Sequence, residues 1–241
     1  MVVILILIIL VLLTNNTEED VYSLLVDSAY LDTLINKYWF LTDEIKNPNI
    51  YYSLEGYLFP DTYQFRDKDV TVKEIFETLL DELDKKLTPY KDDIKNSPYT
   101  VHQLLTLASI VELEGVNKAD RFDVAGVFYN RLNDGWSLGS DVTTYYAIKV
   151  DMSERDLYKA EIDACNYYNT RPNCMAGKLP ISPICNPSIE SIEAAIKPHS
   201  HNYYFFVADK NKKTYFTTTN AEHLNTIETL KSQGLWYEYA S

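Results

Sequence analysis

The stretch Thr100-Val-His-Gln-Leu-Leu-Thr-Leu-Ala-Ser-Ile-Val-Glu-Leu-Glu-Gly115 carries a strong helix signal. Thr100 and Gln103 form a capping box, which satisfies free backbone N–H groups where a helix begins. Apolar residues then recur at helical spacing, at Leu104, Leu105, Ala108 and Val111. Gly115 tolerates the left-handed conformation with which many helices end. The sequence therefore predicts a helix that opens after Thr100 and stops at Gly115.

Glu112 lies in the middle of the apolar face of this predicted helix. At 100° per residue, Leu105 lies within about 20° of Glu112, whereas Glu114 falls about 160° away. Because burial disfavours a charged carboxylate, we expect the pKa of Glu112 to be raised, as a general acid near neutral pH requires. The structural alternative is a buried Glu112 that pairs with Arg121, Arg131 or a backbone group.

Helical signals recur on both sides of this segment. Thr71 and Glu74 form a second capping box, before a helix that ends near Leu87. Further helices are predicted within 18–45, at about 121–132, from Ser188 to Lys197 and from Asn220 onward.

Extended structure is predicted in two places. Aromatic residues alternate around Gly56 and Pro60 from Tyr51 to Phe65, which favours strand and turn structure. Residues 203–207 and 214–218 flank a turn and are predicted to pair as a hairpin. The predicted fold class is therefore α+β, a helix-rich domain with small antiparallel sheet or hairpin elements, preceded by a short helical accessory segment.

Residues 163–187 show no sustained periodicity, contain four prolines and are predicted to form a long ordered loop. The loop holds all three cysteines, Cys165, Cys174 and Cys185, whose spacing matches no CxxC metal or redox motif. The sequence allows one disulfide bond within this trio if the domain lies outside the cytoplasm.

Composition narrows the class of partner. The net charge of -13, without any cluster of Lys or Arg, argues against binding to nucleic acid. The 20 tyrosines combine a flat apolar ring with a hydroxyl group, which suits sugar ligands, although tyrosines also fill cores.

The chain is predicted to have three parts: an apolar N-terminal segment at 1–16, an accessory helical segment at 17–48 and a catalytic domain at 49–241. Residues 2–13 are wholly apolar but shorter than the roughly 17 to 25 residues that cross a bilayer. They also lack a basic flank and a signal-peptide cleavage site. A membrane anchor and a core element both stay open.

Several motifs resemble those of the endolytic murein transglycosylase family. They are Leu54-Glu-Gly-Tyr-Leu-Phe-Pro-Asp-Thr-Tyr63, Leu107-Ala-Ser-Ile-Val-Glu112, Val127-Phe-Tyr-Asn-Arg-Leu132, Ser140-Asp141, Tyr168-Asn-Thr170, Leu179-Pro-Ile-Ser-Pro-Ile-Cys-Asn-Pro187, Tyr204-Phe-Phe-Val-Ala-Asp209 and Glu222-His223. The motifs occur in the order of the family, and the resemblance extends over residues 50–232.

The resemblance implies a lytic transglycosylase that needs no cofactor. Such an enzyme cuts the bond between N-acetylmuramic acid and N-acetylglucosamine within a peptidoglycan strand, leaves a 1,6-anhydro end and helps to terminate strand elongation. The Glu that ends the Ala-Ser-Ile-Val-Glu motif is the catalytic acid of the family and maps onto Glu112. No His and Cys cluster or glycine-rich loop suggests a metal or phosphate site.

Eight polar residues are candidates for substrate binding: Ser140, Asp141, Tyr168, Asn169, Thr170, Glu55, Arg131 and His223. The first five can hydrogen-bond sugar hydroxyls or acetamides, or else stabilise their own loops. Glu55 is a supporting partner of the site or an exposed turn carboxylate. Arg131 pairs with Asp141 or Glu112, or binds a carboxylate of the substrate. The alternative to substrate binding for His223 is a packing or helix-capping role.

By resemblance, the expected partners are peptidoglycan strands and the wall-synthesis machinery with its penicillin-binding proteins. The expected location is the extracytoplasmic face of a bacterial membrane. Relatives commonly have a membrane helix and a LysM-like region before the catalytic part, so residues 17–48 are expected to be a remnant of such a region. Two other functions stay open: a non-catalytic peptidoglycan-binding module, and a muramidase that uses Glu112 together with Asp141.

Overall fold

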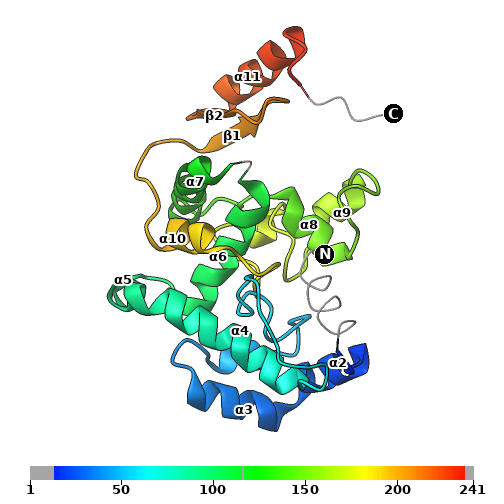
Figure 1. Cartoon of the computed structure of the whole chain (residues 1–241). Helices are drawn as coiled ribbons and strands as arrows, with labels where there is room; N and C mark the ends of the chain where they lie inside the picture. Colours follow the sequence, from blue (N-terminus) through cyan, green and yellow to red (C-terminus); the bar gives the residue numbers. More distant parts are fainter. Residues whose placement is uncertain (1–13, 116, 237–241) are drawn as a thin grey trace.

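The computed structural model describes residues 14–115 and 117–236, and the apolar segment at 2–13 lies outside them. Three groups of elements follow one another from bottom to top in Figure 1. They are α2 (Glu18–Val26), α3 (Ser28–Lys37) and α4 (Val72–Leu87); then α6 (Val101–Glu114), α7 (Arg121–Asn133) and α10 (Ile189–Ile196); then β1 (Phe205–Ala208), β2 (Thr214–Thr217) and α11 (Asn220–Ser232). The predicted α+β class is confirmed.

Short helices complete the fold between these groups. They are η1 (Asp43–Lys46), η2 (Thr88–Tyr90), α5 (Lys91–Asn96), η3 (Lys118–Asp120), α8 (Asp141–Ile148), α9 (Lys159–Asp163) and η4 (Asn173–Met175). In the described part of the chain, no helix has both the length and the apolar character needed to cross a bilayer.

Helix α6 is the centre of the molecule, packed between α7, α8 and α10. Its capping box at Thr100 and Gln103 is present as predicted. Residues from Leu104 to Val111 are all buried, so α6 is enclosed on nearly every side and has no single apolar face. The environments of the Glu112 and Glu114 carboxylates are therefore determined by the residues that pack around the last turn of α6.

The predicted left-handed end of α6 is wrong, because Gly115 has a φ of -71°. A Cβ atom at this position would lie 2.8 Å from Cγ of Arg121 and 2.9 Å from the carbonyl oxygen of Val111. Glycine is thus required here by the close approach of α7, and not by backbone conformation.

The segment Tyr51–Phe65 contains turns but no strand, so the strand part of the prediction is wrong. Leu54, Tyr57 and Leu58 are all buried, which does not fit the alternation of a half-buried strand. Instead the side chain of Asn186 accepts hydrogen bonds from the backbone N–H groups of Gly56 and Leu58. The turn is therefore fixed by the loop at 163–187, which is ordered as predicted.

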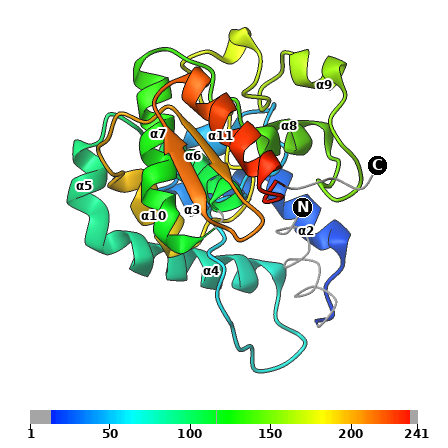
Figure 2. The ribbon, with the colours of Figure 1, turned by 90° about the horizontal axis from the view of Figure 1, so that it is seen from above.

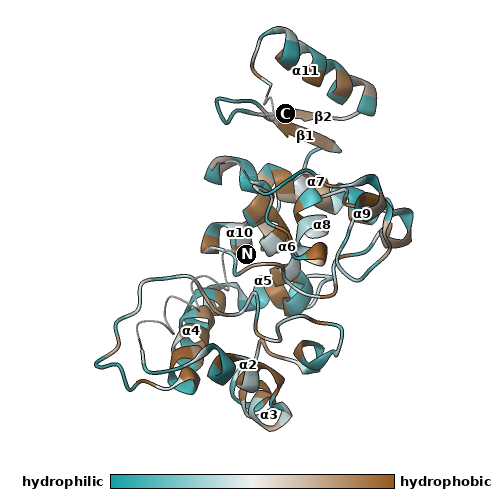
Figure 3. Ribbon diagram, turned by 90° about the vertical axis from the view of Figure 1, so that its right-hand side faces the viewer, coloured by the Kyte–Doolittle hydropathy of each residue, from teal (hydrophilic) through white to brown (hydrophobic). Residues whose placement is uncertain are grey.

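The predicted hairpin is confirmed, with Phe205 opposite Thr217 and Ala208 opposite Thr214 in an antiparallel pair. Figure 2 shows α11 running alongside the two strands, and α11 contacts both of them. Figure 3 shows α4 with brown and teal stretches, as expected of a helix that buries one side.

The cluster of buried apolar residues crosses the predicted boundary between residues 48 and 49. Val21 and Leu34 on one side belong to the same cluster as Phe76 and Leu105 on the other. The boundary between an accessory segment and a catalytic domain stays a prediction.

Candidate active site

Glu112 is the anchor of a polar cluster where α6, α7 and α10 meet. Its Oε1 accepts a hydrogen bond of 2.8 Å from Nη2 of Arg121, which is 8% exposed. Its Oε2 accepts from the backbone N–H of Ser188 at 3.0 Å, from the Ser188 hydroxyl at 2.6 Å and from the Ser191 hydroxyl at 2.8 Å. Glu112 thus fastens the start of α10 and the start of α7 to the end of α6.

The expected raised pKa of Glu112 is wrong. Burial would raise this pKa, but the hydrogen bonds from Ser188 and Ser191 and the charge of Arg121 outweigh burial and lower it. The arrangement matches the structural alternative, in which Glu112 pairs with Arg121. A carboxylate held in this way keeps its negative charge near neutral pH and is a poor proton donor.

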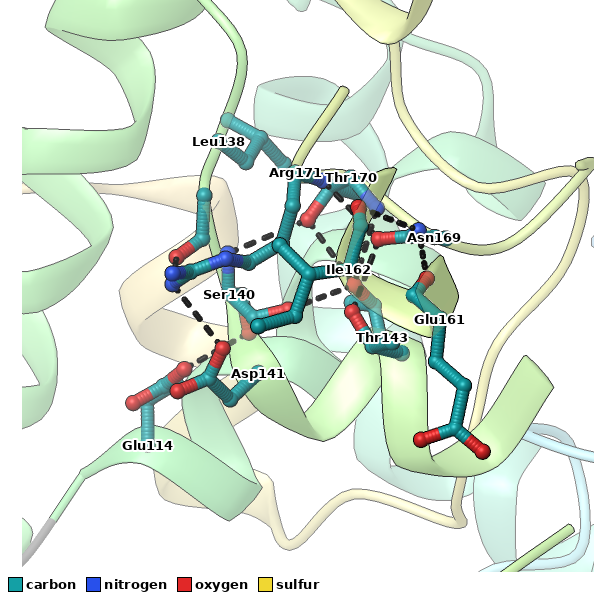
Figure 4. A network of polar contacts seen from close by, with 12 residues as sticks. Glu114, Leu138, Ser140, Asp141, Thr143, Glu161, Ile162, Asn169, Thr170 and Arg171 are labelled. Carbon is teal, nitrogen blue, oxygen red and sulfur yellow. Dashed lines mark hydrogen bonds and ion pairs between the residues drawn. The ribbon is translucent and has the colours of Figure 1, made fainter. Parts of the chain in front are cut away.

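Glu114, the last residue of α6, lies in a different environment (Figure 4). Its half-buried carboxylate accepts a hydrogen bond of 2.6 Å from the hydroxyl of Ser140, which is itself buried. Burial raises the pKa of Glu114, and the negative charge of Asp141 adds to this effect, against the hydrogen bond from Ser140 and the charges of Arg131 and Arg171. This is the behaviour expected of a carboxyl group that holds a proton for transfer.

Asp141 begins α8 beside Glu114, and its side chain is about half exposed. Its Oδ1 lies 2.9 Å from Nη1 of Arg171. The expected pairing of Arg131 with Asp141 or Glu112 is wrong, since Arg131 donates instead to the backbone carbonyls of Tyr204 and Leu138. Arg131 therefore ties the hairpin to the loop that precedes α8.

Tyr168, Asn169 and Thr170 are almost fully buried, at 1%, 0% and 0% exposed. The amide of Asn169 donates to three backbone carbonyls, at 161, 162 and 164, and its oxygen accepts from Thr144. The hydroxyl of Thr170 bonds that of Thr143. Tyr168 bonds the Ser182 hydroxyl and the Tyr51 backbone. These contacts favour the loop-stabilising alternative over direct sugar binding, and they position Arg171 and Ser140 (Figure 4).

Glu55 is not an exposed turn carboxylate, because it is only 7% exposed and accepts a hydrogen bond from the hydroxyl of Tyr146. Burial raises the pKa of Glu55 to about 7. His223 stacks on Phe205, with ring centroids 5.4 Å apart, and its Nδ1 has no partner among the described residues. The contacts of His223 fit the packing alternative.

Two pockets share neighbours with Glu114, although Glu114 itself lines neither of them. The first, here called the tyrosine pocket, has a volume of about 220 Å³ and is lined by Tyr51, Tyr52, Glu55, Leu113, Val142, Tyr145, Tyr146, Lys149, Val150, Asp151, Met152 and Ile184. The second, the arginine pocket, has a volume of about 410 Å³ and is lined by Arg131, Gly135, Trp136, Ser137, Arg171, Asn173, Ala176 and Phe205. Leu113 and Val142 adjoin Glu114 and Asp141 in sequence, and the charges of Arg131 and Arg171 act on Glu114. The tyrosine pocket thus shares α6 and α8 with Glu114 and Asp141, and the arginine pocket contains the two arginines whose charges act on Glu114.

A disulfide joins Cys165 to Cys174, whereas Cys185 is free and buried. The bridge closes the short stretch that carries residues 168–171, and both of its cysteines are exposed. It restricts the loop that presents Arg171 to Asp141.

The environment of Glu114 could not be predicted from helical spacing. Its position next to Gly115, at the end of a capped helix, was the available signal, but the side chain that bonds Glu114 comes from residue 140. The tyrosine pocket could not be predicted either, because its walls come from segments that are far apart in sequence, near 51–55, 113, 142–152 and 184.

Comparisons with known proteins agree with this architecture. A family model described as YceG-like family matches residues 10–229. A curated endolytic murein transglycosylase of Bacillus subtilis (strain 168) is 36% identical over 208 residues, which cover 86% of this chain and 56% of that protein. One of Streptococcus pneumoniae serotype 2 is 34% identical over 215 residues, with 86% and 38% covered.

The fold itself recurs in a solved structure. The 2.6 Å crystal structure of a YceG-like protein from Listeria monocytogenes matches with a TM-score of 0.80 and 32% identity, over 88% of this chain and 68% of that one. The chain spans 56% and 38% of the lengths of the two curated relatives. The match over residues 10–229, together with this shared fold, shows that the chain belongs to the YceG-like family.

Proposed function

We propose that this chain is the catalytic part of an endolytic murein transglycosylase, with Glu114 as its proton donor. The observation that carries the proposal is the half-buried carboxyl of Glu114 at the end of α6, whose pKa is raised by burial and which accepts a hydrogen bond from Ser140. A carboxyl group of this kind can give its proton to a leaving oxygen near neutral pH. The curated relatives with this name support the reaction class.

The reaction needs one carboxyl group. Protonated Glu114 donates its proton to the glycosidic oxygen as the bond from that oxygen to the anomeric carbon of N-acetylmuramic acid breaks, and an oxocarbenium-like centre develops there. The 6-hydroxyl of the same sugar attacks this carbon and forms the 1,6-anhydro ring. The carboxylate of Glu114 accepts the proton of that hydroxyl, which returns the enzyme to its starting state.

Neighbouring groups set the two protonation states of Glu114. The hydroxyl of Ser140 donates to the carboxylate and orients it, while Asp141 opposes its ionisation. Arg171 pairs with Asp141 and so limits this repulsion. Ser140 and Asp141 are therefore proposed to position and tune Glu114. This role differs from the direct contact with sugar that the sequence predicted.

The proposed substrate is peptidoglycan, cut within nascent strands at the extracytoplasmic face of the membrane. The exposed disulfide supports an oxidising compartment, since such bonds persist outside the cytoplasm. Association with penicillin-binding proteins and other parts of the wall-synthesis machinery rests on the family alone.

A two-carboxylate muramidase is the second candidate, because Asp141 lies beside Glu114 and could activate a water. Product analysis separates the two. Purified peptidoglycan digested by the wild-type chain is expected to yield 1,6-anhydromuramic ends by mass spectrometry. Reducing muramic ends would establish the hydrolase instead, and retained glycan binding without cleavage would leave only a binding module.

Reduction of the disulfide is expected to slow cleavage several-fold. Opening the Cys165–Cys174 bridge loosens the loop that carries Arg171, so the partner of Asp141 is held less firmly. The measurement is the rate of release of anhydro ends with and without a thiol reductant. The Cys165→Ser/Cys174→Ser variant is the control, and it should be slow in both conditions. If the reductant still slows this variant, the reductant does not act through the Cys165–Cys174 bridge.

A further inference from the structure

The tyrosine pocket is built from residues that the proton-transfer chemistry does not use. Tyr51 and Tyr146, which line it, form an aromatic cluster with Tyr168, with ring centroids 4.7 to 5.6 Å apart. Leu113 and Met152 are exposed apolar side chains at its edge, 39% and 55% exposed. The walls are therefore mainly flat rings and apolar groups, which suit the C–H face of a pyranose.

Lys149 supplies a positive charge at the edge of this pocket. Its Nζ lies 4.3 Å from the ring centre of Tyr51 and 5.9 Å from that of Tyr52. The residue has a φ of 57°, a backbone conformation that residues other than Gly, Asn and Asp rarely adopt. This conformation ends α8 at Lys149, beside the tyrosines that line the pocket.

Glu55 supplies a buried carboxyl group to the wall of the same pocket. One of its oxygens accepts the hydroxyl of Tyr146, and none of the described residues forms an ion pair with it. With its pKa raised to about 7, the group is present in both protonation states near neutral pH. It can therefore accept a hydrogen bond from an amide N–H or donate one to an amide carbonyl.

We infer that the tyrosine pocket is a sugar subsite that takes one N-acetylated hexose ring, with Glu55 and Lys149 binding its acetamido group. The chemistry of the group matches the lining: an acetamido methyl suits the apolar walls, its N–H and C=O suit Glu55 and Lys149, and a sugar ring suits the tyrosines. The volume of about 220 Å³ suits one sugar ring and not a longer segment. The inference rests on the proposed function for its choice of polymer.

The subsite is tested by direct binding and not by turnover. Calorimetry compares the wild-type chain with Glu55→Gln and Lys149→Asn, using a tetramer of β-1,4-linked N-acetylglucosamine and a glucose tetramer that lacks the acetamido groups. Gln keeps an acceptor for Tyr146, and Asn tolerates the left-handed backbone. Lys213→Asn is the matched control, because Lys213 lies 4.7 Å from the ring centre of Tyr215 in the hairpin, away from the pocket.

The wild type is expected to bind the N-acetylated tetramer about tenfold more tightly than the glucose tetramer, and each pocket variant should lose most of that preference. Lys213→Asn should keep it. Equal affinities for the two tetramers, or unchanged binding by both pocket variants, would overturn the subsite even if anhydro ends are released. Binding as expected without any cleavage of peptidoglycan would overturn the proposed function and leave the subsite in place.

Discussion

Glu114→Gln is expected to lower the rate of peptidoglycan cleavage by roughly 10²- to 10⁴-fold, the usual contribution of a general acid. The substituted amide has no proton to give to the glycosidic oxygen. It retains an oxygen that accepts the Ser140 hydroxyl, so the fold should be unaffected. The measurement is the release of 1,6-anhydromuramic ends from purified peptidoglycan, with thermal unfolding to confirm that both proteins are folded.

The pH dependence of the wild type gives a second signature of the same group. The acid works only in its protonated form, so the rate of cleavage should fall as pH rises through the raised pKa of Glu114. Ser140→Ala removes a hydrogen bond that lowers this pKa and should move the fall in rate to higher pH. A merely structural role for Ser140 would change the rate without moving the profile.

The competing assignment places the acid at Glu112, and the same assay decides between the two. Glu112→Gln should retain substantial cleavage in whatever fraction of the protein is folded, since Glu112 contacts Arg121, Ser188 and Ser191. A Glu112→Gln protein with unchanged unfolding temperature and no cleavage, beside an active Glu114→Gln protein, would reinstate the assignment made from the motif.

Local signals in the sequence predicted most of the helices well. The capping boxes at Thr71 and Thr100 and the apolar spacing behind them placed α4 and α6 within a residue of their observed ends. Such signals depend only on a few neighbouring residues, so they do not depend on how the rest of the chain folds. The hairpin is local in the same sense.

The site was harder to predict because its decisive contacts are long-range. A helical wheel reports one helix and assumes that its apolar side alone is buried, whereas α6 is enclosed nearly all round. Whether Glu112 or Glu114 holds a proton then depends on Arg121 and Ser188 for the first and on Ser140 and other groups for the second. No spacing within residues 100–115 encodes those partners.

The same contacts that disfavour Glu112 as an acid predict a large effect on stability. Glu112→Ala is expected to lower the free energy of unfolding by about 3 to 5 kcal/mol, because it leaves the buried charge of Arg121 without its carboxylate partner. The hydroxyls of Ser188 and Ser191 also lose their acceptor. Chemical denaturation near pH 7 measures the loss.

Two controls separate a buried charge from a lost surface contact. Glu190→Ala breaks the nearby ion pair with Lys118, whose side chain is 72% exposed, and should cost no more than about 1 kcal/mol. Replacing Arg121 by Met in the Glu112→Ala background removes the unpaired charge and should recover part of the stability. If the double variant is as unstable as the sum of the two single ones, Arg121 and Glu112 do not stabilise each other.

The sign of the pH effect follows from the lowered pKa of Glu112 in the folded protein. The unfolded chain binds a proton at this group more readily than the folded chain does. The stability that Glu112 contributes is therefore fully present above its ordinary pKa and is lost as pH falls through the lower, folded value. The difference in unfolding free energy between the wild type and Glu112→Ala should accordingly shrink in acid. A difference that stays constant down to the acid limit of folding would mean that the carboxylate acts through packing and not through its charge.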